Sequence, residues 1–126
     1  MGTLILDASV LIGLLDTFDP HHLTAIEDVE AADQPGRALQ TPASAYSEAL
    51  VAFARADRVL DARQSVAGMG ITVAPLTAPI AERAARLRAE HEGLRLPDAL
   101  VLATAREVDA DLLTYDTQLR RIAKRD

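Results

Sequence analysis

The sequence predicts an α/β domain built on a mostly parallel sheet. Short apolar runs alternate with longer segments of helical periodicity along the 126 residues, which is the pattern of strands joined by crossover helices. No internal repeat, low-complexity tract or long linker divides the chain, so residues 1–126 are expected to form one domain. Apolar residues make up 49% of the sequence, which is enough for a largely aliphatic core.

The first part of the chain is expected to contain two strands and four helices. Thr3–Leu6 is a short apolar run typical of a buried strand. Two later helices are predicted from a capping residue followed by proline, which suits a first helical turn. In order, the predicted elements are a strand at Thr3–Leu6, a helix at Ala8–Leu15, a helix opened by Asp19-Pro20 and ending near Ala32, a strand at Arg37–Gln40, a helix opened by Thr41-Pro42 and ending near Ala56, and a helix capped by Asp57 and ending near Gly68.

The remainder is expected to contain two more strands and three helices. The first of these strands alternates and is rich in β-branched residues, and Leu112-Leu113 is the apolar part of the second. The predicted elements are a strand at Ile71–Ala74, a helix from Thr77 to about His91, a helix started by Pro97 that covers about Asp98 to Val108, a strand at Asp111–Thr114 and a helix at Thr117–Lys124.

The composition excludes several classes of protein. Cysteine is absent, which removes disulfides, thiol nucleophiles and cysteine-ligated zinc. The sequence has no signal-peptide pattern and no uncharged apolar run near the ~20 residues of a membrane span, so we expect a soluble, cytoplasmic protein that does not contact membranes. The net charge is −6, whereas nucleic-acid-binding proteins are usually basic. Basic residues do gather near the C-terminus, where they also suit a solvated last helical turn: Arg120, Arg121, Lys124 and Arg125.

Two of the nineteen acidic residues follow predicted strands closely. Asp7 comes after the first strand and Asp116 after the last one. Ligands of open parallel sheets bind beyond the carboxyl ends of the strands, and both carboxylates reach the same edge if these strands are neighbours. The alternative is structural, because aspartate is also a good N-cap for the helix that follows.

Asp98 and Glu48 are two further acids with apolar neighbours. Asp98 lies in the first turn of a helix that continues as Ala99-Leu-Val-Leu-Ala103, where a carboxylate needs a partner or a metal. A favourable helix dipole or a contact with Arg95 is the alternative. Glu48 lies inside a helix beside an apolar face, and the alternative is an ion pair with Arg55.

Four carboxylates in one pocket would suit a hard divalent cation. Mg²⁺ and Mn²⁺ prefer oxygen ligands and leave coordination positions for water and for a substrate phosphate. Such a cation lowers the pKa of bound water and neutralises charge on a phosphate. Crowded carboxylates without a cation repel one another, so their pKa values should be raised. The sequence leaves open whether one or two ions bind.

These acids and their flanking residues resemble the PIN-domain ribonucleases, and most specifically the VapC toxins of bacterial toxin–antitoxin pairs. Four stretches carry the resemblance, in order along nearly the whole chain: Leu4–Ile12, Ser47–Leu50, Leu96–Ala103 and Leu112–Leu119. The resemblance implies a PIN-like three-layer sandwich and a Mg²⁺- or Mn²⁺-dependent endonuclease that acts on RNA. It also implies a homodimer and a VapB-type antitoxin that blocks the site.

Residue by residue, the resemblance assigns the family's metal-binding and catalytic quartet to Asp7, Glu48, Asp98 and Asp116. Asp7 and Asp98 would be the leading metal ligands. Ser9 and Thr114 occupy positions where the family often has a supporting hydroxyl. Many members have a short last strand after the final helix, and we expect that strand to be missing or very short here.

We therefore expect hydrolysis of RNA phosphodiester bonds, with Glu48 or Asp116 orienting or deprotonating the attacking water. The arginines expected to hold the RNA backbone are Arg95, Arg120 and Arg121. One alternative is an aspartyl phosphoacceptor domain with Asp7 as acceptor, but such domains need a well-placed lysine, and the only lysine is Lys124. The other alternative is a catalytically inactive PIN-like domain that only binds a partner.

The histidines do not predict a metal site. His21 and His22 are adjacent, so on a helix their side chains diverge and are expected to face solvent. His91 suits a helix C-terminus without any function. Motifs of serine hydrolases, Walker loops and dinucleotide-binding folds are absent from the sequence.

Overall fold

The computed structural model describes residues 2–125 and contains one four-stranded sheet. Its strands are β1 (Thr3–Leu6), β2 (Ala38–Pro42), β3 (Ile71–Ala74) and β4 (Asp111–Leu113). The spatial order is β3-β2-β1-β4, and every neighbouring pair is parallel. The carboxyl ends of all four strands therefore meet at one edge, and the predicted parallel α/β fold is confirmed.

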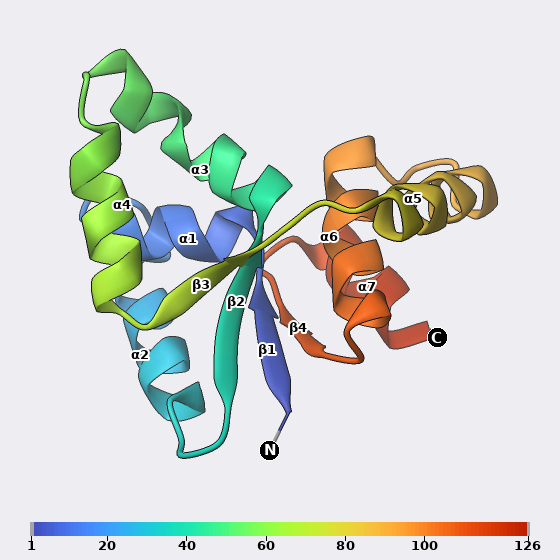
Figure 1. Ribbon diagram of the computed structural model, residues 1–126, viewed down its shortest axis with the longest axis horizontal. Helices are drawn as coiled ribbons and strands as arrows, with labels where there is room; N and C mark the ends of the chain where they lie inside the picture. The colour runs from blue at the N-terminus through green and yellow to red at the C-terminus, as the bar shows by residue number, and fades with distance from the viewer. Residues whose placement is uncertain (1, 126) are drawn as a thin grey trace.

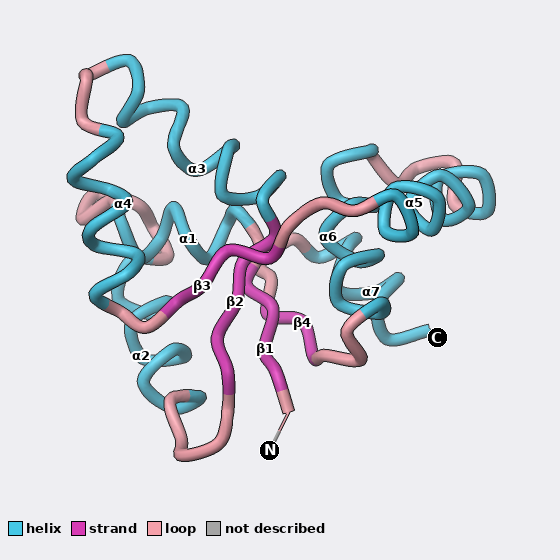
Figure 2. Tube along the Cα trace, in the orientation of Figure 1, coloured by secondary structure: helices cyan, strands magenta, loops and turns pink. Residues whose placement is uncertain are grey.

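Helices cover both faces of this sheet (Figure 1). On one side lie α1 (Ala8–Leu15), α2 (His22–Ala32) and α4 (Val59–Gly68), and on the other lie α5 (Ala78–Glu90), α6 (Leu96–Glu107) and α7 (Thr117–Arg125). The remaining helix, α3 (Ala43–Arg55), starts at the carboxyl end of β2 and extends toward α4. Figure 2 shows the strands as a thin central layer between the two groups of helices.

The alternating side chains of β1 supply both halves of the core. Leu4 and Leu6 pack in the apolar cluster of the α1–α4 side, and Ile5 packs in the cluster of the α5–α7 side. A strand that is buried on both faces is what a continuous apolar run predicts. Helix α3 also contributes to both clusters: Ala45 packs in the cluster of the α5–α7 side, and Ala49 packs in the cluster of the α1–α4 side. This helix therefore crosses the carboxyl edge of the sheet.

Three predicted helix starts are wrong, because the residue expected to cap each helix lies in a turn or in a strand instead. Asp19 accepts a hydrogen bond from the amide of His21 at 3.0 Å in a turn, and α2 begins only at His22. Thr41 is fully buried in β2 and donates its hydroxyl to the carbonyl of Leu6 at 2.9 Å. Asp57 has a positive φ of 57° after the end of α3, and α4 begins at Val59.

Several of the other predicted strand and helix boundaries are confirmed, and the remaining ones differ by one or two residues. The helix predicted to open at Thr77 is confirmed, and Thr77 is its N-cap, because its hydroxyl accepts a hydrogen bond from the amide of Ile80 at 3.4 Å. His91 is the C-cap of α5. Helix α7 continues to Arg125, so no further strand follows it within residues 2–125, and Asp126 lies outside the described residues. In the described part of the chain, no helix combines the length and apolarity needed to cross a bilayer.

Candidate active site

All four predicted acids line one cleft of about 190 Å³ at the carboxyl edge of the sheet. Asp7 follows β1, Glu48 lies in the second turn of α3, Asp98 lies in the first turn of α6, and Asp116 lies between β4 and α7. The other lining residues are Ala8, Ser9, Ile12, Arg95, Pro97 and Val101. Parallel strands and helix starts thus bring together acids that are distant in the sequence.

Asp7 is the most deeply buried of these acids, with 5% of its surface exposed. One carboxylate oxygen, Oδ1, accepts hydrogen bonds from the Ser9 hydroxyl at 2.6 Å and the Val10 amide at 3.2 Å. The other, Oδ2, accepts a hydrogen bond from the Thr114 hydroxyl. Burial raises the pKa of Asp7, and these hydrogen bonds partly oppose that rise. Asp7 is therefore the N-cap of α1 and also a wall of the cleft.

The contact between Asp7 and Thr114 follows from the strand register. Leu6 of β1 pairs with Leu113 of β4, so the next residue of each strand lies opposite the other at the sheet edge. The Thr114 hydroxyl also accepts a hydrogen bond from the Asp116 amide at 3.1 Å. One buried hydroxyl consequently connects Asp7 to the loop that carries Asp116.

Asp116 has both roles that the sequence left open for it. Its Oδ1 accepts a hydrogen bond from the Leu119 amide at 2.8 Å, which caps α7. The same residue lines the cleft. Its Oδ1 is thus bonded to the helix, whereas its Oδ2 accepts no hydrogen bond within residues 2–125 and remains available to a ligand in the cleft.

Asp98 is paired with Arg95. The distance from Arg95 Nε to Asp98 Oδ2 is 3.2 Å, and Asp98 is the more buried partner. This hydrogen bond and the charge of Asp98 raise the pKa of Arg95, with smaller contributions from Asp116 and Glu48. The contact between Asp98 and Arg95, which the sequence left open as an alternative, is thus observed. Both residues line the cleft that also contains the other three acids.

Glu48 is the most exposed of the four acids. Partial desolvation of its carboxyl raises the pKa of Glu48, and the negative charges of Asp98 and Asp7 raise it further, whereas Arg95 lowers it. Within residues 2–125 no ion pair joins Glu48 to Arg55. The acids are therefore close enough to repel one another, as expected for a crowded carboxylate cleft.

Sequence analysis did not single out Tyr115, although it lies between Thr114 and Asp116. Its amide donates a hydrogen bond to the Ser9 hydroxyl at 3.1 Å, and its own hydroxyl donates to Asp28 at 2.7 Å. Its ring stacks on His21 with centroids 4.6 Å apart. Tyr115 therefore fastens the loop after β4 to α2. Its place between two candidate site residues was the only available signal.

The remaining predicted site residues lie in different places. Arg95 lines the cleft, but Arg120 donates to the carbonyl of Thr114 at 2.6 Å and lines a separate cavity of about 380 Å³ beside β4. Arg121 is exposed and lines neither space. His21 and His22 have different partners, since His22 Nδ1 lies 2.7 Å from the Gly13 carbonyl oxygen.

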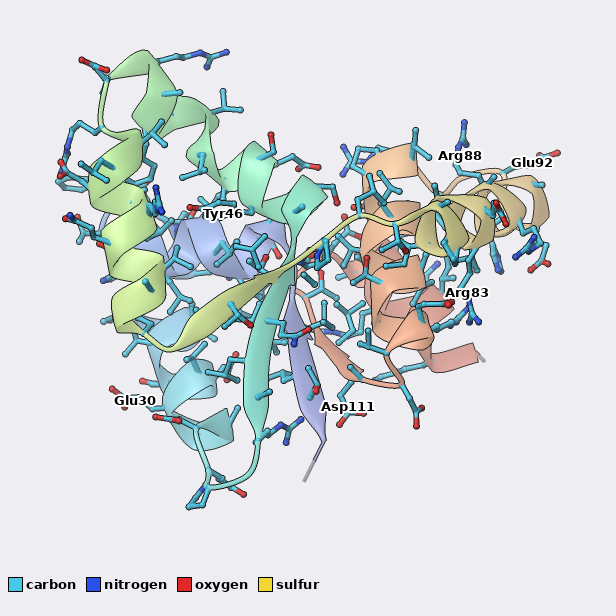
Figure 3. All side chains as sticks on the ribbon, viewed as in Figure 1. Glu30, Tyr46, Arg83, Arg88, Glu92 and Asp111 are labelled. Carbon is cyan, nitrogen blue, oxygen red and sulfur yellow. The ribbon has the colours of Figure 1, made fainter. Side chains whose placement is uncertain are left out.

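One further acid, Asp111, lies at the opposite end of the sheet and does not belong to the site. Asp111 begins β4 and pairs with Arg37 at 3.2 Å. Figure 3 places Asp111 near the lower end of the strands, away from their carboxyl ends. It is therefore a surface ion pair rather than a fifth acid of the cleft.

The four acids fit a hard divalent cation in residue type and position. Carboxylate oxygens are the ligands that Mg²⁺ and Mn²⁺ prefer, and the negative charges of Asp98 and Asp7 add to the desolvation that raises the pKa of Glu48. Their present arrangement is not a preassembled metal centre, because no three Asp, Glu or His side chains in the described ranges are grouped to hold an ion. Asp98 and Asp116 already have protein partners.

Comparison with known proteins points to one family and one fold. The PIN domain profile matches residues 4–125, whereas no curated protein matches the sequence. VapC20 of Mycobacterium tuberculosis, described as a toxin that cleaves the sarcin-ricin loop, is 19% identical with a TM-score of 0.75, and the match covers 94% of each chain.

Two further structures are similar to the chain, and the first of them is described as a toxin–antitoxin complex. One is a complex from Klebsiella pneumoniae, with 27% identity, a TM-score of 0.73, and 90% of this chain and 87% of that one covered. The other is VapBC2 from Rickettsia felis bound to a promoter DNA fragment, with 13% identity, a TM-score of 0.71, and 95% and 92% covered.

Proposed function

Because this chain belongs to the PIN domain family, we propose that it is a Mg²⁺- or Mn²⁺-dependent endoribonuclease. The family resemblance and the PIN-like three-layer fold expected from the sequence are confirmed. The observation that carries the proposal is the convergence of four carboxylates from four separate parts of the chain on one cleft.

In the proposed reaction, Asp7 and Asp98 would hold the cation, and Glu48 and Asp116 would complete the acidic shell. The bound cation would supply charge neutralisation at the scissile phosphate and a lower pKa for a water molecule. Ser9 and Thr114 orient the Asp7 carboxylate through their hydroxyl groups. Their hydrogen bonds also favour its charged form, which is the form that binds metal.

Glu48 is the best placed acid to accept a proton. It is the most exposed of the four acids, and its carboxylate accepts no hydrogen bond within residues 2–125, so it is free to take up a proton. Asp116 is less suited, because the amide of Leu119 already holds one of its oxygens. We assign to Glu48 the removal of a proton from the water that attacks phosphorus, while the opposite oxygen of the phosphodiester leaves. Arg95 meets the RNA backbone in the cleft, and Arg120 and Arg121 contact it from α7.

The biological role that we propose is that of a VapC-type toxin. VapC20 is described as a toxin that cleaves the sarcin-ricin loop, and the Klebsiella pneumoniae structure is described as a toxin–antitoxin complex. For this chain we propose a structured RNA substrate, a VapB-type antitoxin as partner, a homodimer and a cytoplasmic location. The 27% identity to the Klebsiella toxin–antitoxin complex supports the toxin role and the antitoxin partner more strongly than the lower identities do.

RNA cleavage by the purified protein should depend on a divalent cation. Incubation of structured RNA with the protein and Mg²⁺ or Mn²⁺ should give discrete fragments on a denaturing gel, and EDTA should stop cleavage until excess cation is restored. Asp98→Asn protein, purified identically, controls for contaminating nucleases. Undiminished cleavage in EDTA would exclude the proposed mechanism. Labelling of Asp7 by acetyl phosphate would instead favour the phosphoacceptor alternative.

A further inference from the structure

Among the described residues that line the carboxylate cleft, Arg95 is the one with a cationic side chain. We propose that Arg95 is a resident counter-ion: it occupies Asp98 in the metal-free protein, is displaced when a divalent cation binds, and then binds a phosphate of the substrate. This inference rests on the proposed function. It goes beyond the proposed metal ligands by assigning two successive partners to Arg95: Asp98 before the cation binds and a substrate phosphate afterwards.

The ion pair has the geometry of an exchangeable contact. Only Nε of the Arg95 guanidinium is bonded to Asp98 in residues 2–125, so both terminal nitrogens remain available for other acceptors. The Arg95 side chain is 70% exposed and that of Asp98 is 16% exposed. Exposed arginine–carboxylate pairs contribute little to stability, so solvent or another cation replaces them readily.

The charges around Arg95 explain why a metal would compete with it. The negative charges of Asp98, Asp116 and Glu48 all act on its guanidinium. A divalent cation in the cleft carries twice the charge of arginine and attracts the same acids more strongly. While Asp98 is turned toward Arg95, the acids are not grouped as a metal centre. Asp98 Oδ2 must therefore leave Arg95 before it can bind a metal ion.

The backbone allows this exchange without moving a helix. Arg95 is the N-cap residue of α6 and has extended backbone angles, and Pro97 lies in the first turn just after it. Proline fixes the chain direction there, whereas the long arginine side chain keeps its rotational freedom. Movement of one side chain is therefore enough to expose Asp98 and to carry a positive charge toward a phosphate.

Calorimetric titration with Mn²⁺, in the absence of RNA, tests the exchange. Arg95→Met should bind Mn²⁺ about 5- to 10-fold more tightly than the wild type, because the competing charge is gone. Arg95→Lys retains the charge and should bind Mn²⁺ with nearly wild-type affinity. Arg83→Met is the matched control, because it breaks an exposed pair with Glu107 at 3.1 Å on the α5 side of the molecule (Figure 3).

RNA kinetics supply the second half of the test. With saturating Mn²⁺, Arg95→Met should raise KM for RNA several-fold while kcat changes little, because a phosphate contact is lost. Tighter metal binding together with weaker RNA binding is the expected signature. Unchanged or weaker Mn²⁺ binding by Arg95→Met would overturn the inference. If the wild type itself neither binds Mn²⁺ nor cleaves RNA, the proposed function fails instead.

Discussion

Replacing Asp7 with asparagine is expected to lower metal-dependent RNA cleavage by about 1,000-fold, since metal catalysis supplies several kcal/mol and each 1.4 kcal/mol is tenfold in rate. The fold should survive this change. The asparagine Oδ1 can still accept from Ser9 and Val10, and its amide nitrogen can donate to the Thr114 oxygen. Initial rates of RNA cleavage with saturating Mn²⁺ measure the effect.

The same substitution should raise the melting temperature in EDTA at neutral pH. Burial raises the pKa of Asp7 in the folded protein above its ordinary value of 3.8, so the native state disfavours the charged carboxylate. Protonated Asp7 therefore favours the folded state, and this contribution is fully present below pH 3.8. It is lost as the pH rises through the folded pKa of Asp7 and the carboxyl ionises. The advantage of Asp7→Asn should therefore appear above about pH 4, grow as the pH rises through the folded pKa of Asp7, and then stay constant.

Glu82→Gln provides the matched control for both measurements, because it removes an exposed carboxylate of α5 that lies outside the cleft. Its cleavage rate and melting temperature should stay near those of the wild type. Cleavage by Asp7→Asn at the wild-type rate would contradict the catalytic assignment. A variant less stable than the wild type in EDTA at pH 7 would contradict the account of Asp7 as a carboxylate whose charge destabilises the fold.

Thr114→Val should produce the second largest effect, because it removes a hydroxyl that two groups of the site share. Asp7 Oδ2 loses a donor and the Asp116 amide loses an acceptor, in a position that is only 2% exposed. Leaving such groups unsatisfied should lower the free energy of unfolding by about 1–3 kcal/mol. Urea denaturation of the variant and the wild type measures this loss.

The pH dependence of cleavage separates the electrostatic role of Thr114 from its structural one. Its hydrogen bond lowers the pKa of Asp7, so the variant should have a still higher Asp7 pKa. The acidic limb of the rate profile should move to higher pH, with the largest loss of activity at the acidic end. Thr104→Val is the control: this hydroxyl is equally buried but donates only to Leu100 within α6. A profile that moves equally in both variants would refute the role given to Thr114.

The sequence patterns were sufficient to predict the sheet and the meeting of Asp7 and Asp116 at one edge, whereas Glu48 and Asp98 were assigned to the site by the resemblance to PIN-domain ribonucleases. Apolar runs mark the strands, and residues that follow parallel strands share one edge. The alternation within β1 also follows from its sequence, since a continuous apolar strand must be buried on both faces. These features depend on local patterns and on general rules of topology.

The helix starts failed because a capping residue has more than one possible partner. Thr41 and Asp57 have side chains that suit an N-cap, yet one is bonded to a neighbouring strand and the other lies in a left-handed turn. Local propensity cannot distinguish these uses, because the competing partner comes from another part of the chain.

The partners within the site were also beyond local sequence patterns. The contact between Thr114 and Asp7 depends on the β1–β4 register, which pairs Leu6 with Leu113. Tyr115 was overlooked because its contacts, with Ser9, Asp28 and His21, come from α1, α2 and the turn before α2. For Asp98, by contrast, the Arg95 partner lies three residues away, and the sequence does suggest it.

Mn²⁺ binding to single carboxylate variants most directly tests whether the four acids act together as a cation site. Calorimetry would compare the wild type with Glu82→Gln and with four neutralised variants: Asp7→Asn, Glu48→Gln, Asp98→Asn and Asp116→Asn. We expect each of the four to weaken binding by at least about tenfold, and Glu82→Gln to leave it unchanged. Wild-type Mn²⁺ affinity in all four variants would show that the cleft is not the metal centre.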